Sequence, residues 1–123
     1  MIVLDSSAII AILGGTKKGE EIKQKFQEET FAVTTISVEE VLIGFKENYR
    51  PLILNFFKSM EILSFDCDAA YKCVEVQTQL QKKGRMIGKF DIYIASICLV
   101  HGLSIVTLDS DFEVVPSLSV IKL

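Results

Sequence analysis

Acidic side chains recur at four places along the chain, each at the edge of an apolar run. Asp5 follows MIVL, Glu40 lies in SVEEVL, Asp91 precedes IYIASICLV, and TLDSDF supplies Asp109 and Asp111. A carboxylate beside buried sequence costs several kcal/mol unless it is exposed, neutralised or bound to a cation. No His or Cys stands next to any of these carboxylates, so their hard oxygen atoms suit Mg²⁺ or Mn²⁺ rather than Zn²⁺.

Most of these residues also have a simpler structural interpretation. Asp5 is a suitable N-cap for a helix that follows it. Asp91, in a first helical turn, would complement the helix dipole, worth about 0.3–1 kcal/mol. However, the helix that Asp91 begins is apolar nearly all round and is therefore packed on most sides. The dipole alone is a poor explanation for a carboxylate in such a place. Asp109 and Asp111 would pass as ordinary turn residues.

Glu40 has the strongest structural alternative. Ser37 and Glu40 form the pattern S-x-x-E, which predicts a capping box with Ser37 at the N-cap and Glu40 at the third helical position. Glu39 would then point about a quarter-turn away, toward solvent. Taken by itself, the pattern favours capping over metal binding for Glu40.

The elements that must position these carboxylates alternate between strands and helices. We predict strands in five apolar segments, residues 1–5, 31–36, 61–65, 104–108 and 118–123. We predict helices over residues 7–13, 17–28, 37–46, 51–57, 66–83 and 89–101, the last ending before Gly102. This alternation predicts an α/β fold of three layers, α/β/α, around a mainly parallel five-stranded sheet.

The predicted topology brings the acidic motifs together. Asp5 and Asp109 lie just past strand ends, while Glu40 and Asp91 lie in first turns of helices that follow a strand or a loop. In an open α/β sheet, ligands bind at the carboxyl ends of the strands. All four can therefore converge on one edge, where like charges repel unless cations neutralise them.

Composition narrows the class of protein. The chain has 123 residues, half of them hydrophobic, without a linker-like segment, which predicts a single domain over residues 1–123. A formal charge of −3 gives no global basic signature for nucleic acid. We expect no signal peptide and no membrane span, hence a cytoplasmic protein. Cys67, Cys73 and Cys98 have no metal-ligand spacing and are expected to be small buried hydrophobes. His101, the only histidine, falls at the far end of the Asp91 helix.

The motifs VLDSSAII, SVEEVLIG, GKFDIYIA and TLDSDF resemble the sequential acidic motifs of PIN-domain ribonucleases, specifically the small VapC-like toxins. The resemblance covers the whole chain, and the order and spacing of the motifs are more specific than any one of them. Glu40 stands four residues before Gly44, as in the family's E-L-x-x-G, with Val41 replacing the usual Leu. The fourth acidic position varies in the family, so Asp109 and Asp111 both remain candidates.

The resemblance implies a Mg²⁺- or Mn²⁺-dependent endoribonuclease, the toxin of a VapBC-type toxin–antitoxin pair. It implies that one or two ions are held by the catalytic carboxylates Asp5, Glu40, Asp91 and Asp109. A metal-bound water would attack the phosphate in line, leaving a 5′-phosphate and a 3′-hydroxyl. By their family positions, supporting roles fall to Ser7, Thr107 and Asp111.

Two further features concern partners. A basic segment leads into Asp91 and is either solvated surface or an RNA phosphate contact, namely Lys82, Lys83, Arg85 and Lys89. The segments SAIIAIL and RPLILNFFKSM (residues 50–60) carry more apolar residues than one helix stripe needs. Their surplus faces either pack in the core or form a groove or dimer surface. We expect a homodimer that binds an amphipathic segment of a cognate antitoxin.

Other functions for an α/β chain of this length fit less well. A receiver-like phosphoacceptor domain needs an acidic pair after the first strand, and a haloacid-dehalogenase-type phosphatase needs D-x-D there. Here Asp5 is followed by Ser6 and Ser7. A non-catalytic PIN-fold interaction module remains open, although such scaffolds usually lose acidic positions and none is lost here.

Overall fold

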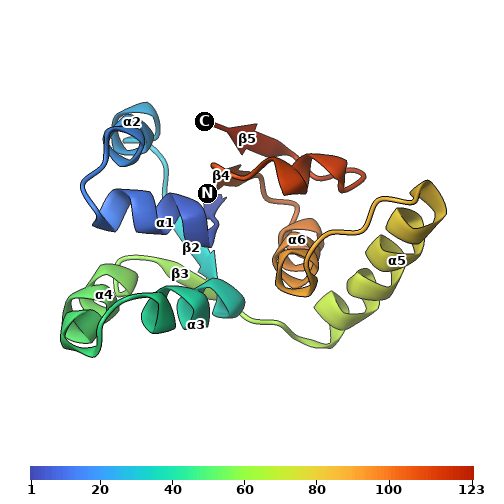
Figure 1. Ribbon diagram of the computed structural model, residues 1–123, viewed down its shortest axis with the longest axis horizontal. Coiled ribbons are helices and arrows are strands. Elements are labelled where there is room, and N and C mark those ends of the chain that lie inside the picture. The colour runs from blue at the N-terminus through green and yellow to red at the C-terminus, as the bar shows by residue number, and fades with distance from the viewer.

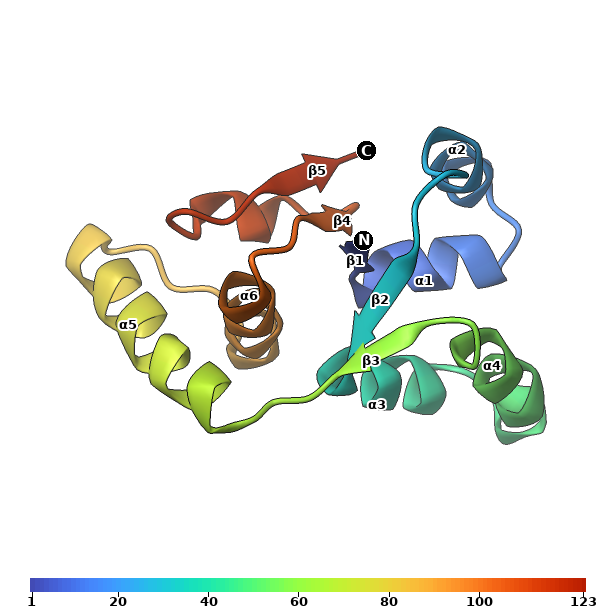
Figure 2. The same ribbon diagram turned by 180° about the vertical axis from the view of Figure 1, so that it is seen from behind.

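The computed structural model describes all residues, 1–123, and its centre is a five-stranded sheet (Figures 1 and 2). The strands are β1 (Ile2–Leu4), β2 (Phe31–Thr34), β3 (Glu61–Leu63), β4 (Ile105–Thr107) and β5 (Val120–Lys122). Every neighbouring pair is parallel, and the order across the sheet is β3-β2-β1-β4-β5. The predicted mainly parallel five-stranded sheet is confirmed.

Six α-helices and two short 3₁₀ helices connect the strands. They are α1 (Ser6–Leu13), α2 (Lys17–Lys25), α3 (Thr35–Gly44), η1 (Glu47–Tyr49), α4 (Arg50–Phe57), α5 (Cys67–Lys83), α6 (Lys89–His101) and η2 (Ser110–Val114). None of the helices combines the length and the apolar character that crossing a membrane requires.

The strands are apolar without alternation because both faces of the sheet are covered. Val3, Ala32 and Ile105 belong to one buried cluster, which also contains the inner faces of α5 and α6. Leu4 and Val106 belong to the other, with residues of α1, α2, α3 and α4. In Figures 1 and 2, α5 and α6 accordingly lie on the opposite side of the sheet from α1, α2 and α4. The three-layer prediction is confirmed.

The start of α3 differs from the prediction. The strand predicted to reach residue 36 ends at Thr34, whose hydroxyl accepts a hydrogen bond from the Ser37 N–H at 3.1 Å and caps the helix. Ser37 is therefore the third helical residue and not the N-cap. The predicted capping box is wrong, and Glu40 lies in the second turn of α3 rather than the first.

Other expectations were met with small differences. Helix α6 spans the predicted residues 89–101, and Gly102 follows with a φ of 64°, in the left-handed conformation that terminates a helix. Helix α2 ends at Lys25, earlier than predicted. Cys73 and Cys98 are buried, but Cys67 is exposed on the first turn of α5, so the expectation of three buried thiols is wrong for that residue.

The strand order also fixes where a site can form. From β1 the chain continues toward β2 on one side, and from β4 it continues toward β5 on the other. The connections thus diverge between β1 and β4, and in open α/β sheets this arrangement places a binding crevice outside the carboxyl ends of the two strands. Asp5 directly follows β1, and Asp109 lies two residues after β4.

Candidate functional site

Asp5 is the most buried acidic residue, with 3% of its surface exposed. Its Oδ1 accepts hydrogen bonds from the Ala8 N–H at 2.9 Å and from the Ser7 hydroxyl at 2.7 Å, while Oδ2 accepts one from the Thr107 hydroxyl. Asp5 therefore caps α1, as its structural interpretation predicts, and also stands in the crevice. Since N-capping uses one oxygen, it does not exclude a second role.

The hydroxyls of Ser7 and Thr107 link the carboxyl ends of the neighbouring strands β1 and β4. The Leu108 N–H donates to the Ser7 Oγ at 3.1 Å, and the Asp109 N–H donates to the Thr107 Oγ1 at 2.9 Å. Each hydroxyl therefore accepts from the backbone beyond β4 and donates to Asp5. This arrangement fixes the Asp5 carboxylate while leaving its negative charge uncompensated.

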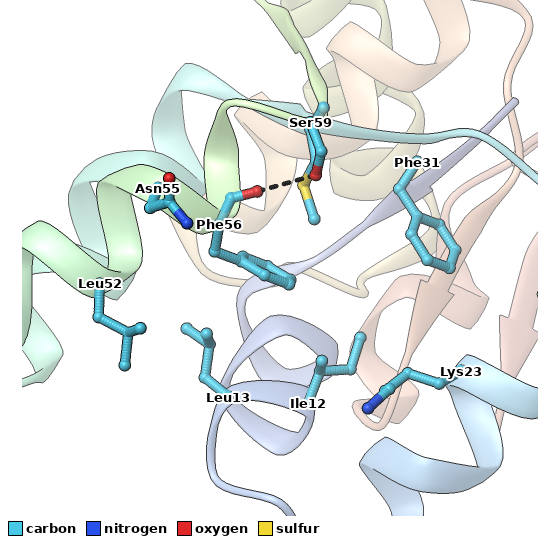
Figure 3. A pocket seen from close by; sticks show the side chains of 9 residues that line it. Ile12, Leu13, Lys23, Phe31, Leu52, Asn55, Phe56 and Ser59 are labelled. Carbon is cyan, nitrogen blue, oxygen red and sulfur yellow. Dashed lines mark hydrogen bonds between the residues drawn. The ribbon is translucent and has the colours of Figure 1, made fainter.

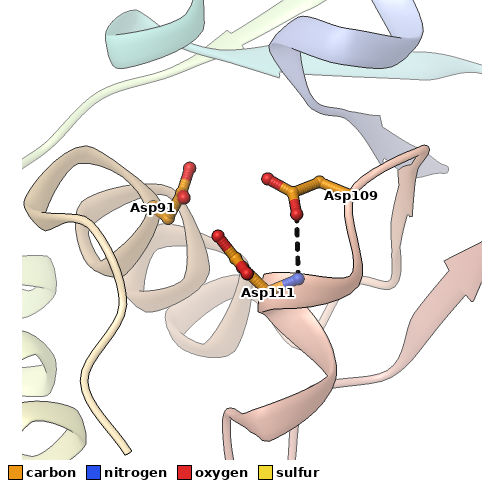
Figure 4. Close-up of side chains that lie close together, drawn as sticks. All are labelled: Asp91, Asp109 and Asp111. Atoms are coloured by element: carbon orange, nitrogen blue, oxygen red, sulfur yellow. Dashed lines mark hydrogen bonds between the residues drawn. The ribbon is translucent and has the colours of Figure 1, made fainter.

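Three further carboxylates form a compact group beside Asp5. Asp91 lies in the first turn of α6, and Asp109 and Asp111 lie at the start of η2. One oxygen from each lies within 4.8 Å of the others (Figure 4). The Asp109 Oδ1 accepts a hydrogen bond from the Asp111 N–H at 2.9 Å, which holds this turn. The structure thus brings both candidates for the fourth acidic position toward Asp91.

Glu40 is hydrogen-bonded to Ser6, which directly follows Asp5 and was not among the predicted site residues. The Ser6 Oγ lies 2.7 Å from the Glu40 Oε1 and 3.0 Å from the Ser37 Oγ. A hydroxyl has one proton and a carboxylate only accepts, so Ser6 donates to Glu40 and the buried Ser37 donates to Ser6. The only sequence signal for Ser6 was its place beside Asp5.

Mutual repulsion and burial perturb these acids. The pKa of Asp91 is raised to about 6, first by burial and then by the charges of Asp109, Glu40, Asp111 and Asp5. Burial also raises the pKa of Asp5, although its three hydrogen bonds oppose the shift. None of the chain's ion pairs involves these residues. The site is therefore an uncompensated concentration of negative charge.

The donor set fits a divalent cation. Asp91, Asp109 and Asp111 offer oxygen atoms close enough to share one ion, and Asp5 and Glu40 lie outside this group but within electrostatic range. His101 is exposed at the other end of α6. Hard oxygen donors without nitrogen or sulfur are typical of Mg²⁺, Mn²⁺ or Ca²⁺ sites.

The basic residues divide into two groups. Arg85 lines a cavity together with Asp111, so the structure brings it to the acidic group. Lys89 instead donates to the Gln77 Oε1 at 3.4 Å and lies 5.6 Å from the centre of the Tyr93 ring. Lys82 and Lys83 are exposed in the last turn of α5. Of the four, only Arg85 shares a cavity with an acidic site residue.

Known proteins resemble this chain in sequence and in fold. Ribonuclease VapC1 of Rickettsia felis is 30% identical over 98% of this chain and 94% of its own length. The tRNA(fMet)-specific endonuclease VapC of Salmonella typhimurium is 25% identical over 96% and 94%. A chain in the crystal structure of VapBC2 from Rickettsia felis, bound to a DNA fragment from their promoter, matches the fold with a TM-score of 0.84 at 24% identity, covering 100% of this chain and 99% of that one.

The family follows from the extent of these matches. The family model described as PIN domain matches residues 2–118, from the first strand to the segment before β5. The match includes all five acidic residues of the crevice. With this match and the 30% identical relative, the chain belongs to the PIN domain family.

Proposed function

We propose that residues 1–123 act as one PIN domain with Mg²⁺- or Mn²⁺-dependent endoribonuclease activity, as the toxin of a VapBC-type pair. The observation that carries the proposal is the convergence of five unpaired carboxylates at the carboxyl ends of β1 and β4. The ribonuclease names of the relatives support RNA as the substrate.

The residues of the crevice have distinct tasks in this reaction. Asp91, Asp109 and Asp111, together with Asp5, would hold one or two ions through carboxylate oxygens. A bound divalent cation supplies charge neutralisation at the phosphate and lowers the pKa of a water ligand. The hydroxyls of Ser7 and Thr107 keep Asp5 oriented.

Glu40 is held in a different way. Ser6 fixes its Oε1 at 2.7 Å, and no hydrogen bond within the chain engages Oε2. Oε2 is therefore available to accept a proton or a hydrogen bond from water, or to bind a cation. No side-chain nucleophile is required, because water is the attacking group.

The ends of the RNA products test this reaction. Purified protein with Mg²⁺ should cut single-stranded RNA to fragments with a 5′-phosphate and a 3′-hydroxyl, because water attacks phosphorus and the 3′ oxygen leaves. Mass spectrometry of the fragments distinguishes these ends. Fragments with a 2′,3′-cyclic phosphate would contradict the proposal, since they arise from attack by the RNA's own 2′-hydroxyl.

The alternatives have less support. A receiver-like domain is wrong for this chain, because its sheet order differs from the 2-1-3-4-5 order of flavodoxin-like folds such as receivers. A non-catalytic PIN module has no need to keep five unpaired carboxylates in one crevice. Complete absence of RNA cleavage by folded, metal-loaded protein would favour that alternative.

We propose that the antitoxin binds in an apolar groove of about 510 Å³ (Figure 3). Its apolar walls come from α1, β2, α4 and the turn after α4, namely Ile12, Leu13, Phe31, Leu52, Phe56 and Met60. Ile53 and Phe57 of α4 are buried in the core, so Leu52 and Phe56 are the surplus face predicted from the sequence. An amphipathic segment suits the groove, and the similar solved chain comes from a VapBC complex.

We propose a separate surface for the homodimer. Ile43 on α3 is 69% exposed and shares a shallow hollow with Val38, Leu42 and Arg50. Ile43 adjoins Val38 and Leu42, and contiguous exposed apolar side chains, unlike single ones, are typical of interaction sites. A second copy of the chain would cover this hollow and leave the groove of α1 and α4 open.

Two lysine substitutions separate the two surfaces. Leu52→Lys, at a side chain that is 62% exposed, should keep the fold and the dimer but weaken antitoxin binding by about tenfold to a hundredfold. Ile43→Lys should give a monomer that binds antitoxin normally. Sedimentation velocity and titration calorimetry measure the two effects. A wild-type monomer at tens of micromolar, or Leu52→Lys with unchanged antitoxin affinity, would contradict the assignments.

A further inference from the structure

A second cavity opens next to the acidic group. It measures about 580 Å³, within the size range of sites for small organic ligands. One wall is the loop between α5 and α6, with Arg85, Met86 and Ile87, and the other is η2. Asp111 belongs to both the cavity and the carboxylate group, so a chain bound at the acids would extend into the cavity.

Besides Asp111, the cavity has two charged side chains, and the fold uses neither of them. Arg85 and Glu113 line the same space, yet they form no ion pair with each other or with another residue. Both side chains are exposed. Since no protein partner engages either charge, both are available to a ligand that carries acceptors for Arg85 and donors for Glu113.

Both walls are anchored in the backbone. Gly84 adopts a φ of 67° at the end of α5, and the Arg85 N–H donates to the Leu80 carbonyl at 2.9 Å. In η2, Phe112 is 1% exposed, and the Val115 N–H donates to its carbonyl at 3.1 Å. Arg85 and Glu113 thus project from backbone that is fixed before any ligand arrives.

The apolar part of the cavity suits the flat face of a base. Met86 is 52% exposed although it is a large apolar residue, and Ile87 and Val114 are half-buried beside it. Single-stranded RNA is recognised through unstacked bases that are stacked on side chains and read along their edges. Met sulfur makes favourable contacts with aromatic rings.

We propose that this cavity binds a guanine base of the RNA strand next to the cleaved bond, a proposal that rests on the proposed ribonuclease function. Guanine presents adjacent acceptors, O6 and N7, which match the fork of an arginine such as Arg85. It also presents adjacent donors, N1–H and N2–H, which match the two oxygens of the Glu113 carboxylate. No other standard base offers both pairs, and Glu113 is therefore a specificity-determining residue.

Sequencing of cleavage products tests the base preference. A pool of short, unstructured RNAs of random sequence should be cut with guanine enriched about tenfold over uracil at one position beside the cut. Glu113→Gln, whose amide places a donor against the guanine donors, should remove most of this enrichment. The matched control Glu28→Gln changes an exposed, unpaired glutamate elsewhere and should retain it. A wild-type pattern without guanine beside the cut, or unchanged enrichment in Glu113→Gln, would overturn the proposal.

Nucleoside binding separates this inference from the proposed function. In metal-free protein, guanosine should shift the backbone amide resonances of Met86 and Val114. Inosine, which lacks only the 2-amino group, should bind several-fold more weakly. Selective guanosine binding without RNA cleavage would sustain the subsite and reject the nuclease. Cleavage with equal binding of guanosine and uridine would reject the subsite and sustain the nuclease.

Discussion

Asp91→Asn is expected to lower RNA cleavage by about a thousandfold or more while the fold is retained. The substitution keeps the shape of the side chain and removes one anionic oxygen from the group of Asp91, Asp109 and Asp111. Metal-assisted charge stabilisation contributes several kcal/mol to such reactions, and each 1.36 kcal/mol is about tenfold in rate. The measurement is the cleavage rate at saturating Mg²⁺, with circular dichroism to verify the fold.

The same variant should be more stable than the wild type in the absence of metal. Because the pKa of Asp91 is raised from 3.8 to about 6 in the folded chain, the folded state binds the proton more tightly than the unfolded state. The charge of Asp91 therefore does not lower the free energy of unfolding below about pH 4, where the residue is protonated in both states. It lowers this free energy increasingly between pH 4 and 6, and by its full amount above pH 6. The Tm advantage of Asp91→Asn should grow over that window and be absent at pH 4.

Two other amide substitutions separate effects on RNA cleavage from effects on Tm. Glu40→Gln should leave the Tm nearly unchanged, because Thr34 and not Glu40 caps α3, yet it should reduce cleavage. Asp5→Asn should lose stability as well as activity, because an amide has one acceptor oxygen, whereas Asp5 accepts hydrogen bonds on both of its carboxylate oxygens. Glu28→Gln, at an exposed glutamate outside the acidic site, serves as the control. Full cleavage by folded Asp91→Asn would show that Asp91 only complements the dipole of α6 and is not needed for the reaction.

The carboxylates could be predicted from sequence where local patterns are strong. Helix α6 is apolar nearly all round and ends at Gly102, so its span and the place of Asp91 in its first turn follow from local chemistry. Asp5 and Asp109 follow short apolar strands, and parallel topology alone brings strand ends to one edge. These features depend on neighbours along the chain.

The environment of Glu40 could not be predicted in the same way. Thr34 and Ser37 are both good caps and stand three positions apart, so only the packed structure selects Thr34. That shift moves Glu40 into the second turn of α3, beside Ser6, which lies 34 residues earlier in the sequence. Likewise, Arg85 and Glu113 line the same cavity only because α6 packs between α5 and the sheet (Figure 1). Contacts of this kind leave no periodic signal in the sequence.

Removal of divalent metal is expected to abolish cleavage altogether and to lower the Tm. Five carboxylates without a cationic partner repel one another, so a bound Mg²⁺ or Mn²⁺ should stabilise the folded state, by about 2.7 kcal/mol at a hundred times its Kd. Differential scanning fluorimetry across a Mg²⁺ titration, with and without EDTA, measures this shift alongside the activity.

Protons should compete with the metal for the same site. Since the pKa of Asp91 is about 6 without metal, lowering the pH from 7.5 to 5 protonates it and should weaken Mg²⁺ binding. In Asp91→Asn this pH dependence should largely disappear, and the Mg²⁺-induced rise in Tm should be smaller than in the wild type. Undiminished cleavage in EDTA, or an equal Mg²⁺ response in both proteins, would show that Asp91 does not contribute to a metal site.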